Sequence, residues 1–230
     1  MAVVYESTAV GERGYDLASR LLKDRIILVE GGVDERMAHE VCAQLQYLDS
    51  ISSDPIRMQI NSPGGSVHMG LAIADRMEQC RSIIQTECTG IAASMGCYLL
   101  AHGTPGYRYA TRRANIMAHQ VSSGTQGHIS DQLISLKHTE ALNTTLMGEL
   151  AVFVGQDIEQ FMFDCDRDKW MSAVEARDYG KLGFIDHVIG VDCGKIDERF
   201  ASQYAKKGAA AVAAPAKKAS ARKPRVAKAK

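Results

Sequence analysis

Residues 56–65 read Ile-Arg-Met-Gln-Ile-Asn-Ser-Pro-Gly-Gly, an apolar alternation that stops at turn-forming residues. The alternation predicts a strand over residues 56–61, which Pro63-Gly64-Gly65 is expected to break. A helical pattern then runs to about residue 78. One strand followed directly by one helix is the unit from which α/β folds are built.

The same unit occurs on both sides of this stretch. A buried strand is expected over residues 25–30, followed by a Gly-Gly turn and a helix to about residue 49 with Asp34 as its N-cap. A third strand is expected over residues 82–89, and residues 107–117 form a further extended stretch. Strands that alternate with helices predict an α/β fold with a mainly parallel sheet.

The composition fits one domain with a tail. The chain has 230 residues, and its hydrophobic content of 46% is enough for a sizeable core. No apolar run reaches the roughly 18 residues that a membrane span needs. The first residues lack the basic region and long apolar stretch of a secretory signal. A cytoplasmic protein without membrane contact is therefore expected.

The six cysteines are scattered and form no C-x-x-C pair. Reduced, partly buried thiols in the cytoplasm are the favoured interpretation, and no metal site is expected. Cys97 follows Ser94 by three residues, but on a helix it is expected to be a packing residue.

The net charge of zero hides a separation of charges along the chain. Residues 206–230 hold nine Lys and Arg and no Asp or Glu, so residues 1–205 carry about −9. The Ala-, Lys- and Pro-rich composition predicts that residues 196–230 are a disordered basic tail. Such a tail could bind nucleic acid or an acidic partner weakly and in a salt-sensitive way.

Ser94 stands in a run of small residues from Gly90 to Gly96, and His119 and Asp168 follow it. A serine hydroxyl is a poor nucleophile until an imidazole takes its proton and a carboxylate orients that imidazole. Residue types alone do not select this set, because the chain has many serines and seven histidines.

Several separated motifs occur in one order over residues 11–189. They are Gly11-Glu12-Arg13, Ser19-Arg20-Leu21-Leu22-Lys23, Ile60-Asn61-Ser62-Pro63-Gly64-Gly65, Ala92-Ala93-Ser94-Met95-Gly96, His119-Gln120 and, after Asp168, Ser172-Ala173. On these motifs the chain resembles the proteolytic subunits of the Clp protease, the ClpP family. The resemblance implies the spiral of βαβ units shared with crotonase-like proteins. It also selects Ser94, His119 and Asp168 as a catalytic triad.

The resemblance implies further site residues. The backbone amides of Gly65 and Met95 would bind the oxyanion. An extended substrate would pair with two stretches that flank the triad. These stretches comprise Gly64, Ser66 and Val67, and Val121, Ser122, Ser123 and Gly124. The family commonly has Pro at the position of Val121, so the N–H group there is new.

Residues 129–154 contain no proline, and apolar residues recur through them, which predicts one long helix. An ordinary core helix would explain the pattern. The resemblance implies instead a protruding handle that joins two stacked heptameric rings of identical subunits.

The resemblance also implies a partner. In the family, hexameric AAA+ unfoldases insert an aliphatic-aromatic loop into apolar pockets at the ring edge. The matching positions here are Arg57, Gln59, Gln79, Glu87 and Thr89. They could simply be solvated positions on the exposed face of the sheet. Burying an apolar anchor against unpaired charges is costly, so atypical docking is expected.

Together these patterns predict a serine endopeptidase subunit of a self-compartmentalising protease that cleaves unfolded proteins and peptides. The expected domains are an N-terminal axial segment at 1–14, a peptidase domain at 15–195 and the tail. No cofactor is implied. ATP would be used by a partner unfoldase, because the chain has no G-x-x-x-x-G-K-[ST] loop.

Three alternatives stay open. A crotonase-like acyl-thioester enzyme could share the spiral fold and the two-amide oxyanion site, but it would not need all three triad residues. A non-catalytic or specialised ring subunit, including a virus-encoded maturation protease, is the second. The third is a nucleic-acid-associated protein, suggested by the tail alone.

Overall fold

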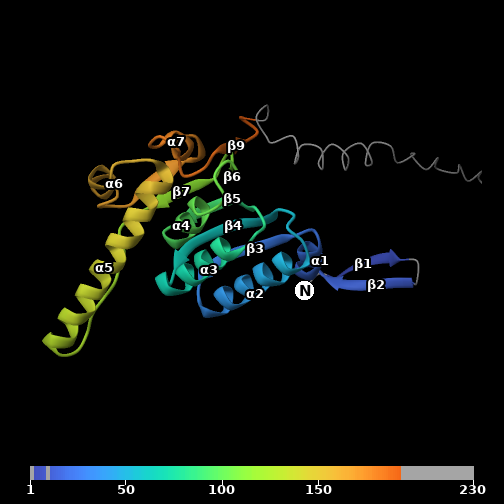
Figure 1. Cartoon of the computed structure of the whole chain (residues 1–230), viewed down its shortest axis with the longest axis horizontal. Helices are drawn as coiled ribbons and strands as arrows, with labels where there is room; N and C mark the ends of the chain where they lie inside the picture. The colour runs from blue at the N-terminus through green and yellow to red at the C-terminus, as the bar shows by residue number, and fades with distance from the viewer. Residues whose placement is uncertain (1–2, 9–10, 193–230) are drawn as a thin grey trace, which may run out of the picture. The chain divides into compact units, whose positions relative to one another are not determined.

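A helical layer covers one face of a mainly parallel sheet of seven strands (Figure 1). The computed structural model describes residues 3–8 and 11–192. The central strands are parallel and stand in the order β3 (Ile26–Val33), β4 (Ile56–Gly65), β5 (Ile84–Ala93), β6 (Arg108–Thr111) and β9 (His187–Ile189). Parallel neighbours need crossover connections. These contain α2 (Glu35–Ile51), α3 (Val67–Gln79) and α4 (Met95–Ala101). The predicted α/β fold is confirmed.

Two short strands extend the carboxyl end of β5. β7 (Asn115–Ala118) pairs parallel with β5, and β8 (Lys169–Ser172) pairs antiparallel with β7. The extended stretch expected over residues 107–117 is therefore two strands, β6 and β7, separated by a turn at residues 112–114.

At two places in the sheet, residues that are typical of turns lie within strands. The prediction that Pro63-Gly64-Gly65 breaks the second strand is wrong, because β4 continues to Gly65. The Gly-Gly turn expected after the first strand is also absent, since β3 runs through Gly32 to Val33 and pairs there with β4. Glycine reaches backbone angles closed to other residues, so it can continue a bulged strand. A register shift after Glu30 marks that bulge.

The predicted start of the helix after Asp34 is confirmed by its cap. The Asp34 side chain accepts a hydrogen bond from the Met37 N–H group at 2.8 Å. Ser172 and Glu175 form a reciprocal capping box at the start of α7 (Ala173–Asp178). Each such cap satisfies an amide that has no partner within its helix and typically stabilises by about 1 kcal/mol.

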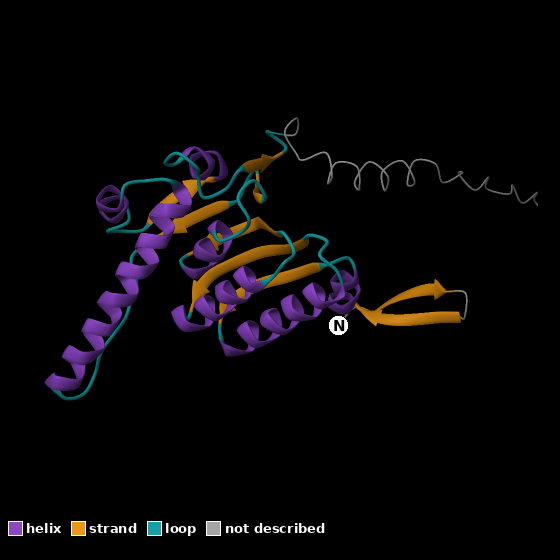
Figure 2. Ribbon diagram, viewed as in Figure 1, coloured by secondary structure: helices purple, strands orange, loops and turns teal. Residues whose placement is uncertain are grey.

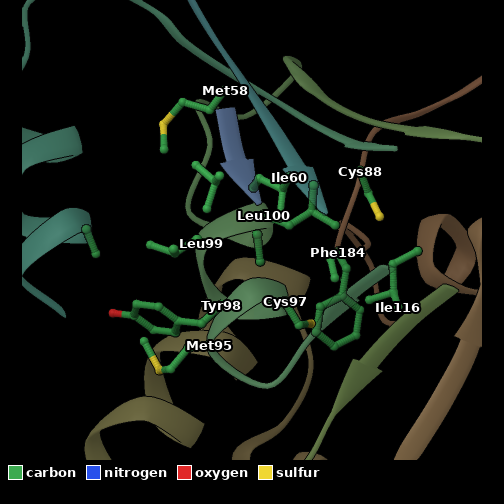
Figure 3. Packing of buried hydrophobic residues seen from close by; sticks show 14 of the residues in the cluster. Met58, Ile60, Cys88, Met95, Cys97, Tyr98, Leu99, Leu100, Ile116 and Phe184 are labelled. Atoms are coloured by element: carbon green, nitrogen blue, oxygen red, sulfur yellow. The ribbon is translucent and has the colours of Figure 1, made fainter. Parts of the chain in front are cut away.

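The core lies between the sheet and its helical layer, and α4 is at its centre. Every residue of α4 is buried, and its side chains meet strand residues such as Met58, Ile60 and Ile116 (Figure 3). Each fully buried large apolar side chain stabilises the fold by roughly 1.5–3 kcal/mol. The element that follows Ser94 is therefore held by the core itself.

The long predicted helix is present as α5 (Ile129–Val154), with α6 (Ile158–Asp164) after it. Its buried residues all lie in the last third: Leu146, Met147, Leu150, Ala151 and Val154. In the first third Ile129 is 78% exposed and Ile134 68% exposed. Figure 2 shows this part of α5 extending past the edge of the sheet.

The N-terminal residues form an antiparallel hairpin of β1 (Val3–Thr8) and β2 (Gly11–Asp16), followed by α1 (Leu17–Lys23). The hairpin thus extends two residues past the expected boundary at residue 14. The predicted basic tail lies outside the described residues. Within the described ranges no helix combines the length and the apolar character needed to cross a bilayer.

Candidate active site

Ser94 occupies the junction between β5 and α4. Its backbone has φ 53° and ψ −122°, a conformation that residues with a side chain rarely adopt. Its N–H group donates to the Met117 carbonyl at 2.9 Å, which continues the pairing of β5 with β7. Strained backbone of this kind is concentrated at functional sites, where the surrounding structure holds it in place.

Strand register places the other two side chains beside Ser94. In the parallel pair β5–β7, Ala93 lies opposite Met117, so Ser94 reaches the end of β7. In the antiparallel pair β7–β8, Ala118 lies opposite Lys169, so the next positions outward, His119 and Asp168, are neighbours. Residues far apart in sequence therefore converge at one edge of the sheet.

The three side chains form one hydrogen-bonded chain. His119 Nε2 lies 2.9 Å from Ser94 Oγ, and His119 Nδ1 lies 3.2 Å from Asp168 Oδ1. A carboxylate beside Nδ1 favours the tautomer with its proton on that nitrogen, which leaves Nε2 to accept the Ser94 hydroxyl proton. The Asp168 side chain is 58% exposed and that of His119 only 23%.

Gly64 allows β4 to approach Ser94 closely. A Cβ atom on Gly64 would lie 2.6 Å from Ser94 Cβ and 2.9 Å from Met95 N, so no larger residue fits. Gly64 also has φ +95°. The buried Ser62 hydroxyl fixes this stretch, since it donates to the Gly31 carbonyl at 2.6 Å and accepts from the Gly64 N–H group at 3.1 Å.

Gly65 and Met95, whose backbone amides are the predicted oxyanion donors, line one cavity together with Ser94. The Ser66 N–H group donates to the Val33 carbonyl at 2.8 Å. Since N–H groups of successive strand residues point to opposite edges, the Gly65 N–H group points away from β3 and toward β5. Met95 is the first residue of α4, and the first amides of a helix have no acceptor within it.

A cavity of about 280 Å³ opens beside Ser94. Gly65 and Val67 border it on one side, and Val121 and Ser122 on the other. Its apolar surface comes mainly from Met95, Met117, Leu146, Met147 and Leu150. The two stretches predicted to bind substrate therefore flank one cavity next to the candidate nucleophile.

The segment from Val121 to Gly127 contains the second stretch predicted to pair with an extended substrate. It forms no strand pairing of its own and contacts α5 from Gln132 to Asn143. The new N–H group at Val121 is already used, because it donates to Asn143 Oδ1 on α5 at 2.8 Å. Ser122, Ser123 and Gly124 are exposed.

Four of the five residues predicted for partner docking share one face of the sheet. Arg57 and Gln59 are on β4, Glu87 and Thr89 on β5, whereas Gln79 ends α3 in the helical layer. For Arg57 and Glu87 the alternative of solvated, unpaired charges is wrong, whereas Gln79 and Thr89 are exposed. Arg57 and Glu87 form an ion pair, and the Glu87 side chain is only 6% exposed.

Cys97 lies fully buried one turn of α4 after Ser94, beside Phe184 (Figure 3). Burial raises the pKa of its thiol well above the usual range, and burial also raises the pKa values of Cys88 and Cys165 to about 11. These thiols stay protonated near neutral pH, which agrees with the predicted packing role.

Among the described residues, no three potential ligand side chains are grouped as a metal site would require.

Two further residues, which were not predicted from the sequence, adjoin the site. Asn143 binds the Val121 amide, and Tyr98 lines the cavity and donates a hydrogen bond to Glu149. Burial, together with that carboxylate, raises the pKa of Tyr98 above its usual range. No local pattern singles out Asn143, because Thr144, Thr145 and Glu149 are also polar residues in the second half of α5.

Residues 9–192 match the family model described as Clp protease. The match covers the second strand of the hairpin, the whole seven-stranded sheet and all three residues of the hydrogen-bonded chain.

Proposed function

Because the chain belongs to the Clp protease family, we propose that it is the serine endopeptidase subunit of a self-compartmentalising protease. A ClpP-type peptidase follows from the family itself. The serine mechanism is supported chiefly by one observation, the hydrogen-bonded chain from Asp168 through His119 to Ser94. The expected substrates are unfolded proteins and peptides.

In the first step, Ser94 Oγ forms a bond to the carbonyl carbon of the scissile peptide. The hydroxyl proton passes to His119 Nε2, 2.9 Å away, so the imidazole acts as general base. Asp168 accepts a hydrogen bond from Nδ1 and stabilises the imidazolium that forms.

The carbonyl oxygen becomes an oxyanion at the tetrahedral stage. The amides of Gly65 and Met95 would donate to it, and loss of one such donor typically costs roughly 10²–10³ in rate. Because Gly64 and the core-held α4 fix these amides beforehand, no reorganisation is needed during the reaction.

The intermediate collapses when the peptide C–N bond breaks and His119 donates its proton to the leaving amine. Water then attacks the Ser94 ester and gives a proton to His119. The peptide carboxyl group leaves, and Ser94 regains its proton from the imidazole. Each chemical role in the cycle is filled by a residue of this chain.

Substrate would lie extended between Gly64, Ser66 and Val67 on one side and residues 121–124 on the other. Since the Val121 N–H group is bonded to α5, the amides of Ser122 and Gly124 are the ones available to a substrate backbone. The mostly apolar cavity beside Ser94 would hold the side chain next to the scissile bond.

Assembly is the second part of the proposal. The exposed apolar first third of α5 favours packing against another subunit, as a handle between two heptameric rings would. Such an assembly would enclose the Ser94 sites in a chamber. We place the protein in the cytoplasm and the hairpin at the axis of each ring.

Docking of a partner unfoldase is the third part of the proposal. An AAA+ unfoldase, which would supply the ATP hydrolysis, would meet the Arg57–Glu87 ion pair with Gln59 and Thr89 beside it. An apolar anchor gains little on such a surface, so the docking would be atypical. The basic tail could add weak contact with nucleic acid or an acidic partner.

Fluorophosphonate labelling combined with native mass measurement tests both parts. We expect one label per chain on an assembly of fourteen chains, and no label on Ser94→Ala. Peptide hydrolysis by Ser94→Ala should fall by a factor on the order of 10⁴ or more. Ser53→Ala, an exposed serine in the loop after α2, is the matched control. Unlabelled wild-type protein, or a label that survives in Ser94→Ala, would favour a non-catalytic subunit or a crotonase-like enzyme.

A further inference from the structure

The N–H group of Val121 donates to Asn143 Oδ1 at 2.8 Å, and Val121 lies two residues after His119. A half-buried amide needs a partner in the folded chain, because water reaches it incompletely. We infer that Asn143 is a positioning residue, which orients the substrate-binding segment through the Val121 amide. This inference rests on the proposed peptidase function.

Two further contacts of α5 hold the same segment. The Ser123 hydroxyl lies 3.2 Å from Thr139 Oγ1, and Gln132 Nε2 donates to the Gly127 carbonyl at 2.9 Å. Thr139 and Asn143 are four residues apart, so they share one face of the helix. Because the segment has no strand partner of its own, these side chains of α5 decide where it lies.

The residue before Val121 is held from the opposite side. The Gln120 N–H group donates to the Cys165 carbonyl at 3.2 Å, and Gln120 Nε2 donates to the Asp166 carbonyl at 2.9 Å. Loss of the Asn143 contact would leave these bonds, which lie next to His119, intact. It would release the chain only from Val121 onward, so peptide binding should suffer more than the activation of Ser94.

The contact also fixes which amides face the substrate. Along an extended chain, successive N–H groups point to opposite sides. With the Val121 amide turned to α5, the Ser122 amide turns to the cavity beside Ser94. Asn143 would therefore set the register in which a peptide can pair with this segment.

The first test compares three substitutions in the full chain. Asn143→Ala should lower kcat/KM for a fluorogenic peptide about 3- to 10-fold, mainly by raising KM. Its rate of fluorophosphonate labelling should stay within about twofold of wild type, because that small reagent needs no pairing segment. Asn143→Asp keeps the acceptor oxygen and should restore KM. Thr145→Ala, whose hydroxyl donates to the Ala141 carbonyl of the same helix, should match wild type.

A double substitution isolates the Val121 amide. Proline has no N–H group and needs no acceptor. In a Val121→Pro background, Asn143→Ala should therefore cause no further rise in KM. An equal rise in both backgrounds would mean that Asn143 acts through something other than this amide and would overturn the inference.

Amide hydrogen exchange tests the same contact and depends neither on catalytic activity nor on whether the Val121→Pro variant folds. Deuterium should enter the Val121 amide faster in Asn143→Ala than in wild type, and at the wild-type rate in Thr145→Ala. Unchanged exchange in Asn143→Ala would overturn the inference. An inactive wild-type chain in which Asn143→Ala still speeds exchange would overturn the proposed function and leave the contact supported.

Discussion

Arg25 and Ser94 are the two residues other than glycine that have a positive φ in residues 3–8 and 11–192, at 61° and 53°. The Arg25 guanidinium compensates its own backbone by binding five oxygen atoms. They belong to the carbonyl groups of Leu48, Ser52, Asp54 and Pro55 and to the hydroxyl of Ser82. Ser94 has one side-chain partner, His119, and its backbone is held by β7 and α4 instead.

The difference separates two ways in which the structure stabilises a residue with a positive φ. At Arg25 the side chain joins the end of α2 to the start of the sheet, so it supplies the stability that offsets the strain. At Ser94 the surrounding core supplies that stability, and the side chain stays available for chemistry. Matched Ala and Gly substitutions can measure this, since Ala keeps the backbone strain and Gly removes it.

The largest expected effect is at Arg25. Arg25→Ala should lower the free energy of unfolding by about 3 kcal/mol, because it leaves several partly buried carbonyls without a donor. Arg25→Gly should recover about 1 kcal/mol of that loss, since glycine tolerates positive φ. Arg25→Lys should not rescue, because an ammonium cannot span the same acceptors. Urea denaturation measures the free energy of unfolding of all three variants. A loss under about 1 kcal/mol in Arg25→Ala would mean that the Arg25 side chain does not offset the backbone strain.

The next expected effect is at Ser94, where the backbone alone decides the difference between the two substitutions. Ser94→Gly should be more stable than Ser94→Ala by about 1–2 kcal/mol, because φ 53° with ψ −122° is open to glycine and strained for alanine. Both variants should be inactive, so the comparison isolates the backbone. Thermal unfolding of the two proteins checks it. Equal melting temperatures would mean that the conformation carries no strain.

The smallest expected effect is a pH dependence around Arg25. The Asp49 carboxylate accepts hydrogen bonds from the N–H group and the hydroxyl of Ser82. The same hydroxyl accepts a hydrogen bond from the Arg25 guanidinium. Burial alone would raise the pKa of Asp49, but the Ser82 hydrogen bonds and Arg81 outweigh it and lower that pKa. A carboxyl with a lowered folded-state pKa stabilises fully above its unfolded value of about 4 and loses this as pH falls further.

Asp49→Asn should therefore flatten the fall in the free energy of unfolding between about pH 4 and pH 2. At pH 7 it should cost about 1 kcal/mol or less. Urea denaturation across this range, with Asp54→Asn as the exposed control in the same region, gives the comparison. Identical slopes for wild type and Asp49→Asn would show that this carboxylate does not contribute.

Much of the fold was predictable from local pattern. The helix over residues 129–154 was predicted with its observed ends, because an uninterrupted apolar period and a following glycine are local signals. The strand conformation of Pro63-Gly64-Gly65 was not predicted, because residues typical of turns also permit the extended backbone of a bulged strand. Which of the two forms depends on pairing with Gly32 and Val33, some thirty residues away.

The site was predictable to a lesser extent. Resemblance selected Ser94, His119 and Asp168, while the reason for their proximity is the joint register of β5, β7 and β8, which no local pattern reveals. The Arg57–Glu87 pair and the contact of Asn143 with Val121 were missed for the same reason. Each joins residues more than twenty positions apart, and the second involves a backbone amide that the sequence does not mark.

The burial of Cys97 has a consequence for the chemical selectivity of covalent inhibitors. An electrophile that enters the cavity beside Ser94 would meet one hydroxyl hydrogen-bonded to an imidazole, while the nearby thiol is sealed in the core and protonated. Reagents that favour oxygen nucleophiles should therefore react with Ser94. Thiol-directed reagents of similar size and shape should react with neither Ser94 nor Cys97.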